Sequence, residues 1–327
     1  MYRSAMKDLY QWKEKSDKKP LIIRGARQVG KTWLMREFGR VAFDDMVYIN
    51  FDNNSQMKEL FSLDMRIERI ITGLELYVGH KIEPLNTLLV FDEVQEVPQA
   101  LAALKYFNEN APKYQIVCAG SLLGVALHGG TSFPVGKVEF LDLYPLSFTE
   151  FMRAMGRELF VELLEKKDFV MATTFKQEFI DLLKHYYYVG GMPEVVRNFA
   201  ADKDFGEVRE IQQRILDSYE QDFSKHAPNE IVPRIRMLWN SIPVLLTKEN
   251  KKFVYGIIKD GARAKDYELA LMWLSDCGLV HKVHRVTAPH IPLKAYEDLK
   301  AFKLFVLDVG LLSCMFRLNQ KVLLSGN

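Results

Sequence analysis

The residues with the clearest chemical potential in this sequence form a glycine-bounded pattern near its start. The run Gly25-Ala26-Arg27-Gln28-Val29-Gly30-Lys31-Thr32 matches G-x-x-x-x-G-K-[ST]. In such a loop, backbone N–H groups and the positive end of the following helix converge on an anion. Lys31 is expected to reach the β- and γ-phosphates of a nucleotide, and the Thr32 hydroxyl to hold Mg²⁺. A chance match is the alternative, but an apolar strand precedes the pattern and an amphipathic helix follows it. The predicted cofactor-binding residues are Gly25, Ala26, Arg27, Gln28, Val29, Gly30, Lys31, Thr32 and Trp33.

A pair of carboxylates is the second chemical feature. The apolar stretch 87–91 runs directly into Asp92 and Glu93, as a Walker B strand does. Asp92 is expected to orient Mg²⁺ through water, and Glu93 to position or deprotonate the attacking water. The pair could instead cap the strand and face solvent. Because it follows a complete phosphate loop, we interpret it as functional.

Two other polar residues have open roles. Ser121 is expected at the end of the fourth strand, where its hydroxyl either contacts the γ-phosphate or the nucleophilic water, or caps the following helix. Together with Lys31 and Glu93, it completes the predicted catalytic set. Arg27 either contacts phosphate or a neighbouring subunit, or faces solvent. No arginine finger is unambiguous, and the candidates, each more commonly a surface charge, are Arg153, Arg157, Arg197 and Arg214.

These residues need a parallel sheet to bring them together. Apolar strands are expected at 21–24, 46–51, 87–93, 114–121 and 137–143, and helices at 4–15, from Lys31 onward, at 65–78 and at 99–110. This alternation is typical of a doubly wound α/β fold, whose ligand lies at the carboxyl ends of the strands. We expect the fourth strand beside the first and third.

The middle of the chain is helical in pattern. Residues 148–224 contain long amphipathic runs, including 174–187 and 207–223, interrupted at Gly190-Gly191-Met192-Pro193. This region is expected to form a lid over the nucleotide. The stretch His185-Tyr186-Tyr187-Tyr188 could stack on the base, although aromatic residues at helical spacing more commonly belong to a core.

The last hundred residues have a different pattern. Helices at 234–246, 251–259 and 264–277, a strand at 279–286, a turn at Pro289 and Pro292 and a second strand after it predict a winged helix. The expected domains are therefore an α/β core at 1–150, a lid at 151–230, and at 231–327 a winged-helix domain with the start of a truncated C-terminal domain. Basic residues here could meet DNA phosphates, and they are Lys251, Lys252, Lys259, Arg263 and Lys265. Asp266 and Glu268 would repel phosphate, which favours a packing module instead.

Composition limits the partners. The 327 residues are enough for two or three units, and 44 basic against 42 acidic residues leave a net charge of +2, too balanced to indicate nucleic acid or an anionic membrane. Cys118, Cys277 and Cys314 lack C-x-x-C spacing and are expected to be buried in a reducing compartment. No leader or run of about 18 apolar residues is found, so a cytoplasmic protein without a membrane partner is expected.

Several motifs together resemble a known family. They are Gly25–Thr32, Val90–Gln95, Ala119–Ser121, Leu143–Phe151, Tyr188–Val196, Trp273–Leu279 and Phe302–Leu312. The chain resembles AAA+-like ATPases of bacteria and archaea, of the signal-transducing P-loop type, in which a domain of unknown function follows the AAA domain. The resemblance implies ATP and Mg²⁺ as cofactors, a helical lid and a winged helix. Similar proteins usually have Asn or Thr where Ser121 stands, and continue into a nuclease-like part, whereas this chain stops at Asn327.

Two functions follow from these features. The first is a Mg²⁺-dependent ATPase whose nucleotide state moves the winged-helix region. The second is a nucleotide-gated regulatory or DNA-binding module with little turnover. A GTPase is disfavoured because the sequence has neither D-x-x-G after the third strand nor N-K-x-D. A protein partner and a homo-oligomer remain open.

Overall fold

The computed structural model describes residues 1–120, 133–247, 253 and 255–324. The chain divides into two compact units. One is Arg3–Tyr144, and the other combines Met1–Tyr2 with Pro145–Asn327. The borders expected at residues 150 and 230 stay predictions.

The first unit contains a five-stranded parallel sheet, with the strand order β2-β3-β4-β1-β5. Its strands are β1 (Leu21–Arg24), β2 (Asp45–Asn50), β3 (Thr87–Asp92), β4 (Gln115–Ala119) and β5 (Glu139–Asp142). The fourth strand lies between the first and third, as predicted. Every residue of β3 and β4 is buried, as expected for parallel strands covered on both faces. The prediction of a P-loop-type α/β sheet is confirmed.

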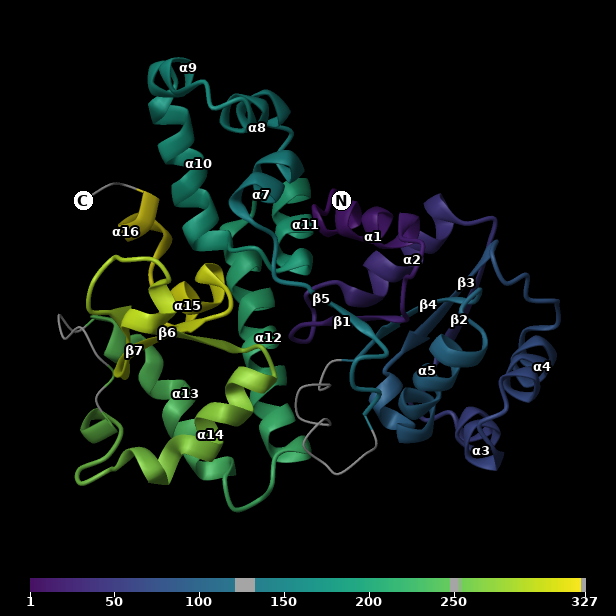
Figure 1. Ribbon diagram of the computed structural model, residues 1–327. Helices are drawn as coiled ribbons and strands as arrows, with labels where there is room; N and C mark the ends of the chain where they lie inside the picture. Colours follow the sequence, from purple (N-terminus) through teal and green to yellow (C-terminus); the bar gives the residue numbers. More distant parts are fainter. Residues whose placement is uncertain (121–132, 248–252, 254, 325–327) are drawn as a thin grey trace. The chain divides into compact units, whose positions relative to one another are not determined.

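Helices cover both faces of this sheet (Figure 1). They are α1 (Ala5–Glu14), α2 (Lys31–Ala42), α3 (Ser55–Leu63), α4 (Ile67–Val78) and α5 (Pro98–Asn110). Alternate residues of a strand point to opposite faces. On one face, Phe91 packs edge-on against Phe51 and Phe61 beneath α3, α4 and α5. Phe38 of α2 packs against Trp12 of α1.

Helix α3 has no counterpart in the sequence prediction. Its N-cap Asn54 accepts a hydrogen bond from the Met57 N–H at 3.1 Å, and Met57 and Phe61 are buried. A helix this short shows too few turns for its apolar period to stand out.

The second unit is mostly helical. Its first helices are α7 (Phe148–Ala154), α8 (Glu158–Glu165), α9 (Phe169–Thr174), α10 (Lys176–Val189), α11 (Pro193–Asp202) and α12 (Phe205–His226). The later elements are α13 (Val232–Thr247), α14 (Ala264–Asp276), β6 (Val280–Val286), β7 (Glu297–Val306), α15 (Val309–Met315) and α16 (Gln320–Leu324). Strands β6 and β7 form an antiparallel hairpin. The winged-helix interpretation of this region stays a prediction.

The helix expected over 251–259 needs a correction. Lys251 and Lys252 lie outside the described residues, and Tyr255–Ile257 form a single 3₁₀ turn. Gly256 lies in this turn, and glycine costs about 1 kcal/mol relative to alanine inside an α-helix.

Three of the motifs behind the family resemblance meet at one buried point of the second unit. The Asp308 carboxylate accepts a hydrogen bond from the Gly191 N–H at 2.6 Å, and the Leu146 N–H donates to the Gly191 carbonyl at 2.6 Å. A Cβ on Gly191 would lie 2.0 Å from the Leu146 carbonyl oxygen. The glycine pair therefore does more than end α10, because it lets three chain segments approach closely.

Candidate functional site

The backbone of the loop between β1 and α2 requires its glycines. Gly25 has φ +147°, and a Cβ there would lie 2.2 Å from the Leu143 carbonyl oxygen. Gly30, at the N-cap of α2, has φ +94°, and Gln28 between them has φ +65°. Positive φ angles this close together turn the chain sharply and bring successive N–H groups to one side.

Lys31 places its ammonium group inside this loop. The side chain is 7% exposed, and Nζ donates to the carbonyl oxygens of Gly25 at 2.9 Å and Ala26 at 2.7 Å. Burial lowers the pKa of Lys31 to about 8, against the opposing effect of Glu93 and Asp92. A bound polyphosphate would have to draw the ammonium group away from these two carbonyls.

The phosphate loop and the carboxylate pair meet through Asp92. Thr32 Oγ1 donates to Asp92 Oδ2 at 2.7 Å, and the Tyr48 hydroxyl donates to the same oxygen at 2.8 Å. Asp92 is 4% exposed, and its other oxygen, Oδ1, accepts from the Glu93 N–H at 3.1 Å. Two motifs 60 residues apart in sequence thus form one site at the carboxyl ends of the strands.

The donor set suits a magnesium ion. Mg²⁺ prefers oxygen ligands and is usually held by one or two protein groups together with waters and substrate phosphates. The Thr32 hydroxyl and the Asp92 carboxylate are such oxygens, already in contact. Burial and the Asp92 carboxylate raise the pKa of Tyr48 to about 12, so its hydroxyl remains a donor to Asp92 at neutral pH.

Glu93 has a left-handed backbone, with φ +52° and ψ +43°. This conformation costs a non-glycine residue about 1 kcal/mol, and such outliers gather at functional sites. The half-buried carboxylate accepts a hydrogen bond from Gln95 Nε2 at 2.7 Å. Its orientation is therefore fixed by the backbone and by Gln95.

Two residues that support this site were missed from the sequence. Tyr48, on β2, donates to Asp92 as described, and the Arg36 guanidinium lies 3.9 Å from the centre of its ring. Arg3 is buried and donates from Nη1 to the Val29 carbonyl of the phosphate loop at 2.9 Å. Tyr48 carried the weak signal of a polar-tipped residue between buried strand neighbours, whereas Arg3 carried none.

The other residues predicted to bind the cofactor or to act in catalysis differ in their exposure to solvent. Ala26 and Val29 are buried, and Arg27 is half-buried. Trp33, in the first turn of α2, is 42% exposed, whereas the other three tryptophans of the chain are buried. Ser121 lies outside the described residues, so its expected role stays a prediction.

The remaining sequence predictions have mixed outcomes. The three cysteines are free and buried, as expected. Arg153, a candidate arginine finger, forms ion pairs with Glu158 at 2.9 Å and Glu165 at 3.0 Å within its own unit. Among the described helices, none combines the length and the hydrophobicity needed to cross a membrane.

Two family models match the chain, one over its N-terminal part and one over its C-terminal part. Residues 17–152 match the AAA domain family, and residues 180–322 match a domain of unknown function (DUF8612). No curated protein matches the sequence.

One solved structure supports the P-loop-type α/β fold. The Walker-type ATPase Paby2304 of Pyrococcus abyssi is similar with a TM-score of 0.59 and 16% identity, covering 96% of this chain and 95% of that one. The ORC1 protein of Aeropyrum pernix in complex with DNA has a TM-score of 0.37 and 12% identity, covering 97% and 93%. The RuvB Holliday junction branch migration motor of Thermotoga maritima has a TM-score of 0.39 and 10% identity, covering 94% and 92%. At scores as low as these last two, the likeness carries no inference about this chain.

Proposed function

We propose that this chain, whose residues 17–152 match the AAA domain family, binds ATP with Mg²⁺ at the loop Gly25–Thr32 and hydrolyses it. The observation that carries the proposal is the 2.7 Å contact between Thr32 Oγ1 and Asp92 Oδ2. It joins the phosphate loop to a buried carboxylate, which is the pair that P-loop enzymes use to hold the metal of a nucleotide.

The chain's own residues supply binding and charge stabilisation. The loop N–H groups and the Lys31 ammonium face the phosphates, where they stabilise charge that develops on the transferred group. Thr32 and Asp92 would hold the Mg²⁺, which when bound would neutralise charge on the phosphate oxygens. Tyr48 keeps the Asp92 carboxylate in place by donating to Oδ2.

Glu93 is the proposed general base. Its carboxylate positions the attacking water and accepts its proton, a role that typically contributes a factor of about 10² to 10⁴ in rate. The hydrogen bond from Gln95 Nε2 limits the rotation of this side chain. Gln95 therefore acts as a positioning residue.

Two substitutions test the assignment. Glu93→Gln keeps the shape of the side chain and removes the base, so we expect ATP binding within about twofold of wild type and a loss of turnover of about 10²-fold or more. Lys31→Ala should abolish binding. Glu96→Gln is the matched control, because Glu96 is an exposed carboxylate three residues farther along.

Single-turnover hydrolysis separates the two candidate functions. A wild-type rate equal to that of Glu93→Gln would remove Glu93 from the mechanism and leave the nucleotide-gated module as the better assignment. Competition between ATP and GTP for the same site tests the expected preference for adenine.

We also propose that the nucleotide state changes the conformation of residues 231–327, the predicted winged helix. The exposed cations Lys259, Arg263 and Lys265 make DNA a candidate partner, although the exposed Asp266 and Glu268 oppose it. Anisotropy of labelled duplex DNA, with and without ATP and Mg²⁺, tests both points. A signal that stays flat up to micromolar protein at low salt would exclude DNA as the partner.

A further inference from the structure

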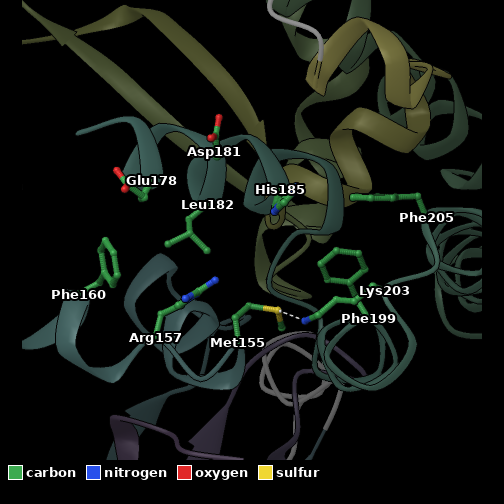
Figure 2. Close-up of a pocket in the computed structure, with 10 residues that line it drawn as sticks. All are labelled: Met155, Arg157, Phe160, Glu178, Asp181, Leu182, His185, Phe199, Lys203 and Phe205. Carbon is green, nitrogen blue, oxygen red and sulfur yellow. Dashed lines mark hydrogen bonds between the residues drawn. The ribbon is translucent and has the colours of Figure 1, made fainter. Parts of the chain in front are cut away.

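The second unit contains a cavity of about 430 Å³ that the ATPase proposal does not use (Figure 2). It lies where α8, α10, α11 and the start of α12 meet. All of its lining residues lie between positions 155 and 205, within one compact unit, and none belongs to the phosphate loop. The volume is in the range of small-molecule sites.

One part of the lining is apolar. Figure 2 shows Leu182 pointing from α10 into the cavity, with Phe160 and Phe199 on either side of it. Phe199 is 2% exposed and packs against Phe205 and His185, with ring centroids 4.8 Å and 6.0 Å away. This part of the wall is therefore held in place by its own neighbours, and suits an aromatic or branched apolar body.

Two cations lie on the opposite side from α10. Arg157 is the N-cap of α8, and Lys203 is the C-cap of α11. Lys203 Nζ donates to the sulfur of Met155, a weak acceptor, at 3.0 Å, and lies 5.1 Å from the centre of the Phe199 ring. Within the part of the chain that the structure describes, neither cation forms an ion pair. Nearby Arg153, by contrast, contacts two carboxylates.

The backbone of Lys203 ends α11 in an unusual conformation for a lysine. Its φ is +57°, in the left-handed region that favours glycine at the end of a helix. This conformation is less favourable for a lysine than for a glycine. Lys203 contacts a thioether sulfur and the Phe199 ring, and within the described residues neither it nor Arg157 forms an ion pair, so the two cations beside this apolar wall are suited to an anion with an apolar body.

We propose that this cavity binds a monocarboxylate with an aromatic or branched apolar body. The carboxylate lies between Arg157 and Lys203, and the body lies against Leu182 and Phe199. Glu178 and Asp181 also line the cavity and balance the two cations, which disfavours a dianion such as a phosphate monoester. In Figure 2 both acidic side chains project from the α10 side, away from Arg157. A free organic acid and the apolar C-terminus of a peptide share this chemistry.

Isothermal titration calorimetry on the full chain tests the proposal. The probes are 3-phenylpropionate and its neutral amide, and a short peptide ending in phenylalanine with a free or an amidated C-terminus. We expect saturable binding of the acids and about tenfold weaker binding of the amides, because a charge-assisted hydrogen bond is lost. Tighter binding by the free-acid peptide would identify the ligand as a peptide C-terminus. Tighter binding by phenylpropionate would identify it as a small organic acid.

Matched variants locate the site. Arg157→Met and Lys203→Met should each weaken acid binding about tenfold, whereas Arg197→Met, which removes an exposed cation of α11 outside the cavity lining, should not. All three positions are exposed, and a thermal melt of each variant checks that it folds. The proposal is overturned by the absence of saturable acid binding, by equal binding of acid and amide, or by unchanged affinity in both cavity variants.

Discussion

Nucleotide affinity should fall steeply above about pH 8, because the proposed phosphate-binding group is Lys31, whose pKa is lowered to about 8 by burial. In the absence of a phosphate, Lys31 loses its proton as the pH rises through this value. A bound polyphosphate favours the charged ammonium, so binding above about pH 8 requires the uptake of one proton.

The magnitude follows from this pKa. With a free-protein pKa of about 8 and a much higher pKa in the complex, the protonated fraction falls from about three quarters at about pH 7.5 to about 3% at about pH 9.5. The dissociation constant should therefore rise by about 25-fold, or about 1.9 kcal/mol. The terminal phosphate of ATP is already ionised over this range, so its own titration adds little.

Trp33 provides the assay. It adjoins Thr32 and is the exposed tryptophan of the four, so its fluorescence should report occupancy of the loop. Trp33→Phe should lose the signal, and calorimetry on this variant then shows whether the indole itself contributes to binding. Calorimetry at about pH 9 in two buffers of different ionisation enthalpy should count about one proton taken up. An affinity that stays constant from about pH 7.5 to about pH 9.5, with no proton uptake, would refute the role given to Lys31.

Three further perturbations test separate parts of the structure. Tyr48→Phe removes one of the hydrogen bonds to the buried Asp92 carboxylate and should lower the free energy of unfolding by about 1 to 3 kcal/mol. It should also raise the Mg²⁺ concentration needed for turnover. An unchanged Mg²⁺ requirement would show that Tyr48 does not support the metal site. Gly25→Ala places a Cβ 2.2 Å from the Leu143 carbonyl, and a denaturant titration should show a loss of several kcal/mol or no folded protein. Burial raises the pKa of Asp308 to about 6, so the native state holds this proton more strongly than the unfolded chain does. The contribution of Asp308 to stability should therefore be lost as the pH rises from about 4 to about 6. Asp308→Asn should flatten this dependence of melting temperature on pH, and a dependence equal to that of wild type would exclude Asp308 as its source.

The glycines and the apolar strands are the features that made the fold predictable. The expected strand positions and the order of the central strands agree with the structure because a buried parallel strand reads as a continuous apolar run. Short or irregular elements were harder to predict from the sequence. Helix α3 was missed, and the helix expected at 251–259 is a 3₁₀ turn where it is described. In such stretches capping and glycine content compete with a weak apolar period.

The amino-acid sequence by itself determined the glycine-bounded loop, the carboxylate pair and the α/β class, because each depends on residue types at fixed local spacing. Only the tertiary structure decided that Tyr48 and Thr32 share one oxygen of Asp92, that Arg3 donates to the loop, and that Arg157 and Lys203 face one cavity. These contacts join segments far apart in the chain. Their geometry depends on how strands and helices pack, which no local pattern records.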